Sequence, residues 1–485
     1  MSGPSERRSA NVWLVAAFLT STPLLLALGH GMWVMPYPIS ETVSLLQTAG
    51  VMGEASAPSD AWIDPTVRSF FDPAVRAWYR PLYHLTWYTF WQSTGSLEAT
   101  LFLFKALEVG LVILLAGLLL WRLRPSTFVE YAAASFAVAV LVGMPGFREN
   151  LELPLPMTLI GMLLALVVWM LIERESRAWH APVIVVLTII AIGYKEQGLV
   201  LLPVIVAAWW TGAPGASRTT TLVTTALGVA YLIFRVTTAG SWPLFAQDVG
   251  LGFVTIPAGV ASERFGSFPV WVYAYNGMST VANILFSEPT GGVFMIVRGL
   301  VYGQTIPWHI NHLLSSMALT GLVIWWGIGV WKRDPPRTWS PESRVLAATF
   351  VAIVASGALS FNYSRDRLGG MAVAFYAIAS YYAVRAAADR AMRASRGVMV
   401  GASLGLLLLA AGWHIRALGT VENARIDAAK IQREWIADPQ ARRTEFANQP
   451  GYVRILEAMI AQGLEPLPPR PFAYPAWVFT LLGAE

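Results

Sequence analysis

Long apolar runs recur along almost the whole chain, and they constrain its fold more than any other feature. A helix needs about 20 apolar residues to cross the hydrocarbon core of a bilayer. About eleven runs approach this length, at residues 11–29, 98–121, 129–146, 154–172, 182–193, 196–211, 219–237, 310–331, 343–361, 367–387 and 397–416. Only 13% of the residues are charged, whereas soluble domains carry roughly 25%. The sequence therefore predicts an all-α polytopic membrane protein.

The distribution of basic residues predicts how these helices are oriented. Cytoplasmic loops of membrane proteins are enriched in Lys and Arg. With the N-terminus inside, every inner segment is basic, through Arg7, Arg8, Arg122, Arg124, Arg174, Arg177, Arg218, Lys332, Arg333, Arg337, Arg385, Arg390, Arg393 and Arg396. This parity requires the segment "GYKEQG" to be an outside turn between two spans, although one long buried helix over 182–211 is an alternative. The C-terminus is then extracytoplasmic.

The spans divide the chain into a transmembrane domain, residues 1–416, and a short extracytoplasmic tail, residues 417–485. Two outer loops are long, at 30–97 and 238–309, and the first contains segments typical of amphipathic helices. The tail has helical and proline-rich segments. The first apolar run follows "SERR" and resembles a signal peptide, but it lacks a small-residue cleavage site. We therefore interpret it as an uncleaved span.

Composition excludes several kinds of chemistry. The chain has no cysteine, so it has no disulfides, thiolate nucleophile or Cys-based metal site. The six histidines are scattered and do not have the spacing of a metal-binding motif. The net charge of +5 is small for this length and reflects inner arginines rather than nucleic-acid binding.

Charged residues cluster at the expected outer ends of the spans, where they are costly unless paired or functional. The clusters are Glu41 in "PISETV", Arg80 and His84 in "YRPLYHL", Arg148 and Glu149 in "MPGFRENLELP", Lys195 and Glu196 in "GYKEQG", and Arg365 and Arg367 in "NYSRDRLGG". Arginine and lysine at this level suit a phosphate, and a carboxylate can act as a base on a sugar hydroxyl. A lipid-linked phosphosugar fits this combination.

Four segments resemble, in their order, the motifs of the C-type (GT-C) membrane glycosyltransferase superfamily. They are "YRPL" at 79–82, Pro145 to Glu149, "KE" at 195–196 and "SRDRLGG". The similarity covers about residues 10–390 and is greatest to the O-mannosyltransferase branch. It implies a GT-C-like helical bundle in a bacterial plasma membrane, an inverting-type transfer from a polyprenyl-phosphate sugar, and an active site on the outer face. The acceptor, whether protein, lipid or polysaccharide, stays open. No cofactor or obligatory metal is expected.

The resemblance also implies roles for individual residues. Glu41 is the expected catalytic base, and Arg80, Lys195, Arg365 and Arg367 are the expected ligands of the donor phosphate. His84, Arg148, Glu149 and Glu196 are expected to support them.

The sequence departs from the family pattern at several positions. Where the family has a pair of acidic residues, this sequence has Ser40 and Glu41. Where the family has a His before Pro145, this sequence has Met144, and the late motif lacks the family's tyrosines. The family's tetratricopeptide tail is absent. Asp60, Asp64 and Asp72 are alternative carboxylates in the same loop.

Each of these residues also has a purely structural interpretation. Arg80 and Lys195 can extend to the headgroups, Arg148 can pair with Glu149, and Arg365 and Arg367 can anchor a helix at the interface. The missing carboxylate therefore leaves an alternative function open: a catalytically inactive or transport-type protein that binds lipid-linked saccharides. A transporter is expected to place polar residues near the bilayer midplane, whereas these clusters lie at one end.

Overall fold

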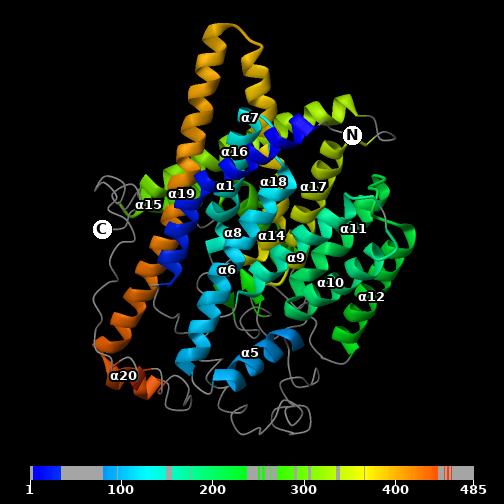
Figure 1. Ribbon diagram of the computed structural model, residues 1–485. Helices are drawn as coiled ribbons and strands as arrows, with labels where there is room; N and C mark the ends of the chain where they lie inside the picture. The colour runs from blue at the N-terminus through cyan, green and yellow to red at the C-terminus, as the bar shows by residue number, and fades with distance from the viewer. Residues whose placement is uncertain are drawn as a thin grey trace.

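The protein is a bundle of helices in the computed structural model (Figure 1). The structure describes residues 4–33, 80–94, 97–148, 156–175, 177–237, 249–251, 254–256, 270–288, 292–303, 307–334, 339–364 and 366–445, with a few isolated positions elsewhere. All statements below concern these residues.

Six of the described helices are long and apolar enough to cross a membrane. They are α1 (Pro4–Trp33), α6 (Leu97–Leu123), α16 (Pro307–Arg333), α17 (Pro341–Leu359), α18 (Gly370–Met392) and α19 (Arg396–Ala437). Each overlaps one of the runs identified in the sequence. The expectation of a multi-pass helical membrane protein is therefore confirmed.

Five shorter apolar helical segments coincide with the remaining runs. They are α7 (Phe128–Gly143), α9 (Met157–Ile172), α10 (His180–Tyr194), the 3-10 helix η1 (Glu196–Val200) continued by α11 (Leu201–Trp210), and α12 (Arg218–Thr237). A bilayer-spanning helix is usually 17 residues or longer, so a total of eleven spans stays a prediction.

The remaining elements are short or lie in the two long loops. They are α5 (Pro81–Thr94), α8 (Pro145–Arg148), α14 (Val270–Phe286), α15 (Val293–Val301), η3 (Asp366–Gly369), α20 (Pro439–Glu445), and the antiparallel strands β1 (Val249–Leu251) and β2 (Val254–Ile256). The all-α expectation is confirmed for the described residues, in which β1 and β2 are a minor pair of three residues each. The predicted tail boundary at residue 417 lies inside α19, which continues to Ala437.

The helix α18 forms the centre of the bundle. It packs against α7, α9, α16, α17 and α19, and its residues from Gly370 to Val384 are all buried. Many of these residues are alanines, whose small side chains let neighbouring helices approach closely. The same principle operates between α14 and α17, where a Cβ on Gly357 would lie 2.9 Å from the carbonyl oxygen of Gly277.

Local capping fixes where several helices begin. The Thr127 hydroxyl accepts a hydrogen bond from the backbone N–H of Glu130, and the Glu130 carboxylate accepts one from the backbone N–H of Ser126. Ser340 caps α17 in the same way through the N–H of Ser343, and Pro341 follows at the first helical position. Such caps satisfy the N–H groups that a helix leaves unpaired at its start.

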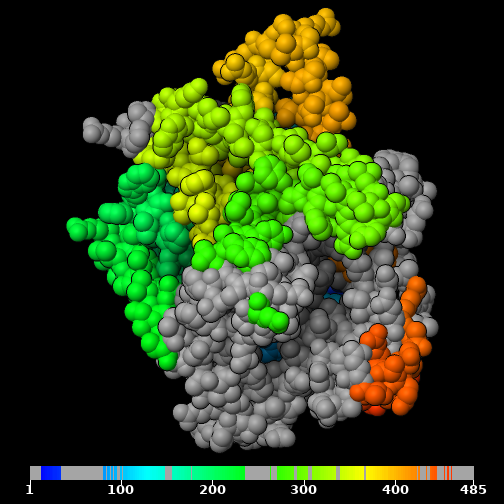
Figure 2. Space-filling model, turned by 180° about the vertical axis from the view of Figure 1, so that it is seen from behind, coloured from blue at the N-terminus to red at the C-terminus, as the bar shows by residue number. Residues whose placement is uncertain are grey.

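The bundle has two chemically different ends. The basic end contains the start of α1, the ends of α6, α16 and α18, and their Arg and Lys residues. The hairpin of α18 and α19 projects beyond the other helices there (Figures 1 and 2). The motif end, on the side of α5 in Figure 1, contains the start of α5, which directly follows Arg80, and the turn between α10 and α11.

Candidate functional site

The central contact of the motif end is an ion pair between Arg80 and Glu196. The Arg80 Nε and Nη2 atoms donate to the two carboxylate oxygens of Glu196 at 2.9 and 2.6 Å. Both side chains are largely buried, with 19% and 18% exposed. The contact brings together the "YRPL" and "KE" segments, which are 116 residues apart in the sequence.

The electrostatic surroundings of Arg80 favour its charged form. Burial alone lowers the pKa of Arg80, but attraction and hydrogen bonding to Glu196 outweigh it, so the net shift of the pKa is upward. The phenols of Tyr363 and Tyr83 lie near enough to add to this shift. Tyr363 directly precedes the "SRDR" segment, so a third segment of the expected site lies beside Arg80.

Lys195 lies at a break between two helices. Its backbone is extended, with φ −161° and ψ 140°, between the end of α10 and the start of η1. A Cβ on Gly198 would come within 2.4 Å of the backbone of Ala191, so the close return of the chain requires glycine there. "GYKEQG" is therefore a turn, and the alternative of one continuous helix over 182–211 is wrong.

The ammonium group of Lys195 points into the bundle. The residue is 3% exposed, and its Nζ atom donates to the hydroxyl oxygen of Thr158 at 3.3 Å. Thr158 belongs to the first turn of α9, just after the segment that contains Glu149. A second hydrogen bond, 2.9 Å between Thr86 Oγ1 and the Tyr194 phenol oxygen, joins α5 to the end of α10.

Close backbone packing brings the last two motif segments to the same place. The short helices α8 and η3 pack against each other. A Cβ on Gly370, directly after η3, would lie 2.2 Å from Cγ2 of Thr158 and 4.0 Å from the carbonyl oxygen of Gly146. Thr158 therefore contacts Lys195 on one side and the start of α18 on the other.

Several expected site residues lie outside the described residues. These are Glu41, its alternatives Asp60, Asp64 and Asp72, and Glu149 and Arg365. For His84, Arg148 and Arg367 the structure describes only the backbone, in α5, α8 and η3 respectively. Their expected roles stay predictions.

A buried cation that we did not single out in the sequence lies in the interior of the bundle. Arg416 is 0% exposed. Its Nη1 atom donates to the carbonyl oxygen of His312 at 3.2 Å and to the hydroxyls of Ser315 and Ser316 at 3.1 and 2.5 Å, and its Nη2 atom donates to the hydroxyl of Ser287 at 2.8 Å. The guanidinium carbon lies 4.0 Å from the ring centre of Trp413.

Arg416 connects three helical segments through neutral groups. Ser315 and Ser316 belong to α16, Ser287 directly follows α14, and Arg416 itself is in α19. About 20 residues separate it from the start of α19, which corresponds to roughly 30 Å along the helix. The signal in the sequence was a charge at the last position of the run 397–416, where it was interpreted only as the end of a span.

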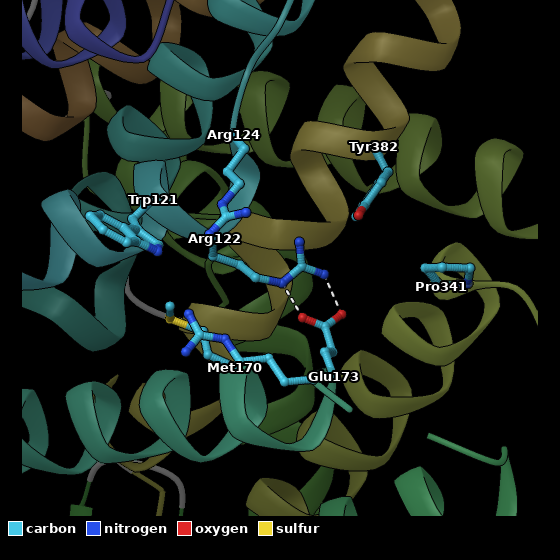
Figure 3. A pocket seen from close by; sticks show the side chains of 8 residues that line it. Trp121, Arg122, Arg124, Met170, Glu173, Pro341 and Tyr382 are labelled. Atoms are coloured by element: carbon cyan, nitrogen blue, oxygen red, sulfur yellow. Dashed lines mark hydrogen bonds and ion pairs between the residues drawn. The ribbon is translucent and has the colours of Figure 1, made fainter. Parts of the chain in front are cut away.

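The basic end contains a cavity of about 300 Å³ that is lined by Arg122, Arg124, Arg174 and Glu173, of which Arg122 and Glu173 form an ion pair (Figure 3). Arg122, near the end of α6, faces Glu173, just after α9, and both guanidinium-to-carboxylate contacts are made. Trp121 and Tyr382 also line the cavity. Among the described residues, no group of three His, Asp or Glu side chains is arranged to hold a metal ion.

Comparison with known proteins gives no match to a family model, to a curated protein or to a solved structure. The resemblance to GT-C glycosyltransferases therefore rests on the motifs of this sequence.

Proposed function

We propose that the protein is a membrane glycosyltransferase that uses a polyprenyl-phosphate sugar and acts at the motif end. The observation that carries this proposal is the convergence of separate motif segments. Arg80 contacts Glu196, Lys195 contacts Thr158, and Thr158 packs against Gly370 beside Gly146. Four segments that occur in the order typical of these enzymes therefore meet in one region.

The proposed reaction is a single displacement at the anomeric carbon. A hydroxyl oxygen of the acceptor attacks that carbon, and the bond from the carbon to the phosphate oxygen breaks. The hydroxyl proton passes to a carboxylate, for which Glu41 is the proposed base. Polyprenyl phosphate leaves with the bonding electrons, so negative charge grows on its phosphate and nearby cations stabilise the transition state.

Arg80 and Lys195 are the proposed cations of this site, and Glu196 positions Arg80. The two contacts with Glu196 run from Nε and Nη2 of Arg80 to the two carboxylate oxygens. This two-point ion pair fixes the plane of the guanidinium group. Arg365 and Arg367 are the proposed additional phosphate ligands, and His84, Arg148 and Glu149 are the proposed supporting residues.

The proposed topology has eleven spans, a cytoplasmic N-terminus and an outer motif end in a bacterial plasma membrane. Its support is the location of Arg122, Arg333, Arg390 and Arg393 at one end of the bundle, because cytoplasmic segments are enriched in such residues. On this orientation the motif end faces the outer leaflet, where a polyprenyl phosphate headgroup is accessible.

The first experiment measures binding of undecaprenyl phosphate to the purified protein in detergent. Native protein is expected to bind it, and Arg80→Ala and Lys195→Ala are expected to weaken binding at least about tenfold, since each removes a cation worth roughly 1.5–3 kcal/mol in a charged hydrogen bond. Arg177→Ala is the matched control, because Arg177 is exposed at the basic end. Folded native protein that does not bind the lipid would overturn the donor site.

A turnover assay separates an enzyme from an inactive or transport-type protein. Release of undecaprenyl phosphate from its sugar conjugates is measured for native protein and for Glu41→Gln. An enzyme is expected to lose turnover in this variant and to keep lipid binding. Lipid binding without turnover of any tested conjugate, in native protein and variant alike, would favour the non-catalytic alternative.

A further inference from the structure

A second and larger cavity, of about 790 Å³, opens at the basic end and lies apart from the motif end. One wall is the last part of α16, with Trp325, Ile328 and Lys332, and the other is the projecting part of α18, with Arg390 and Arg393. Figure 2 shows the α18–α19 hairpin extending beyond the body of the molecule in this region.

Some cations of this cavity are already neutralised by carboxylates. Arg333 and Arg385 both contact the carboxylate of Glu342, at 2.6 and 3.1 Å, and Arg385 also contacts Glu130 at 3.3 Å. These contacts connect the ends of α16 and α18 to the starts of α17 and α7. Arg333 and Arg385 are therefore neutralised by carboxylates of the protein itself.

Three other cations of the cavity have no such partner. Among the described residues, no carboxylate lies within ion-pair distance of Lys332, Arg390 or Arg393. All three side chains are exposed, and Arg390 and Arg393 are three residues apart on one face of α18. The cavity contains five cations and two carboxylates, so it favours an anion.

The wall beneath these cations is apolar and aromatic. On α16, Trp325 and Ile328 line the cavity and are 41% and 52% exposed, and Trp331 beside them, outside the cavity, is 60% exposed. Outside the cavity, Val400, Leu404 and Leu408 of α19 are also exposed. Such surfaces are stable in contact with lipid, and tryptophan followed by lysine and arginine marks the boundary between hydrocarbon and headgroups.

We propose that this cavity binds the headgroup of an anionic phospholipid in the leaflet at the basic end. The phosphate would contact Lys332, Arg390 and Arg393, and an acyl chain would lie along Trp325 and Ile328. Basic pockets between membrane helices bind such headgroups by the same combination of contacts. A volume of about 790 Å³ is typical of sites for small molecules, roughly 300–1,000 Å³. A soluble phosphate would leave the apolar wall uncovered.

The test uses native mass spectrometry of the full chain with added phosphatidylglycerol or phosphatidylcholine. The native protein is expected to bind phosphatidylglycerol at least about tenfold more tightly, because each Lys or Arg near an anionic headgroup contributes roughly 1 kcal/mol. The triple variant Lys332→Gln, Arg390→Gln and Arg393→Gln is expected to lose this preference. These side chains make no ion pair among the described residues, so the variant is expected to fold.

A matched triple variant controls for net charge. Arg177→Gln, Arg218→Gln and Arg396→Gln remove three exposed cations from the same end, and none of them lines the cavity. This control is expected to keep the preference for phosphatidylglycerol. Equal loss in both triple variants, equal binding of the two lipids by native protein, or displacement of the lipid by millimolar inorganic phosphate would overturn the proposal. None of these outcomes depends on binding of polyprenyl phosphate at the motif end.

Discussion

Arg80 and Arg416 are both largely removed from water, but their charges are stabilised in different ways. Arg80 is 19% exposed on its side chain and contacts both oxygens of the Glu196 carboxylate. Arg416 is 0% exposed, and its hydrogen bonds go to three serine hydroxyls and one backbone carbonyl. The first arginine is compensated by an opposite charge, and the second by oriented dipoles and the ring of Trp413.

This difference separates a contact that can exchange from one that holds helices together. A ligand phosphate can replace or join the carboxylate of Glu196, because both are anions that bind guanidinium in the same planar way. Arg416 instead needs acceptors from α16 and from the residue after α14 at the same time. We therefore expect Arg416 to determine stability and Arg80 to determine ligand binding.

Replacing Arg416 by alanine should have the largest effect on stability. The variant leaves a cavity and removes the donor shared by Ser287, Ser315 and Ser316. Large-to-small substitutions at buried sites cost about 2–5 kcal/mol, and loss of charged hydrogen bonds adds to this, so we expect a loss of about 4 kcal/mol. Equilibrium unfolding in mixed micelles measures it.

The control is Arg416→Met, which keeps a long apolar side chain. Replacing a buried charge by an apolar group of similar volume is often nearly neutral. Ser287 and Ser316 already share a hydrogen bond of 2.8 Å, so their hydroxyls keep a partner. We expect a loss of about 1 kcal/mol. Equal losses in the two variants would mean that the charge itself, rather than packing, holds the three segments together.

Removing the partner of Arg80 should have the next largest effect. Glu196→Ala leaves a mostly buried cation without its carboxylate. For a fully buried pair this costs about 3–5 kcal/mol, and partial exposure of Arg80 lowers the expected loss to about 2 kcal/mol. Adding Arg80→Met should restore most of the stability, as a double-mutant cycle of unfolding free energies will measure. A double variant no more stable than the single variant would contradict a direct coupling.

The sequence predicted the helices well because hydropathy alone determines which segments avoid water. All eleven apolar runs coincide with described apolar helical segments. The segment "GYKEQG" is a turn, and only a glycine fits at Gly198 because a side chain there would clash with the backbone of Ala191. The lengths of the helices were harder to predict, because a helix can continue beyond its apolar run. Thus α19 extends through Glu422 and Arg425, which neutralise each other in a buried pair.

The candidate site was predicted as a set of segments, but not as contacts. Motif order indicated that Arg80, Lys195 and Glu196 belong to one region, yet the pairing of Arg80 with Glu196 across 116 residues depends on how α5 packs against α10. Arg416 was missed for a related reason. Its partners are ordinary serines of other segments. No local sequence pattern shows which serines accept a hydrogen bond from an arginine.

Ser316→Ala tests whether serine hydroxyls stabilise the charge of Arg416, and we expect a smaller loss of stability than for Glu196→Ala. The Ser316 hydroxyl accepts the 2.5 Å hydrogen bond from Arg416, and bonds to charged groups contribute about 1.5–3 kcal/mol. Because Ser315 and His312 still accept from the same nitrogen, we expect a loss near 1.5 kcal/mol. Ser380→Ala is the control, since this buried serine bonds only within α18. In the Arg416→Met background the effect of Ser316→Ala should largely disappear.

The smallest expected effect concerns Thr158, which contacts both Lys195 and the start of α18. Thr158→Val removes the hydroxyl that accepts from Lys195 at 3.3 Å and keeps a methyl group beside Gly370, whereas Thr158→Ser keeps the hydroxyl and removes that methyl. Each should cost about 1 kcal/mol or less in unfolding free energy. If the hydroxyl positions the ammonium group for a phosphate, only Thr158→Val should weaken undecaprenyl phosphate binding, and by less than Lys195→Ala does. Equal binding by both variants would show that the hydroxyl of Thr158 does not position Lys195 for a phosphate.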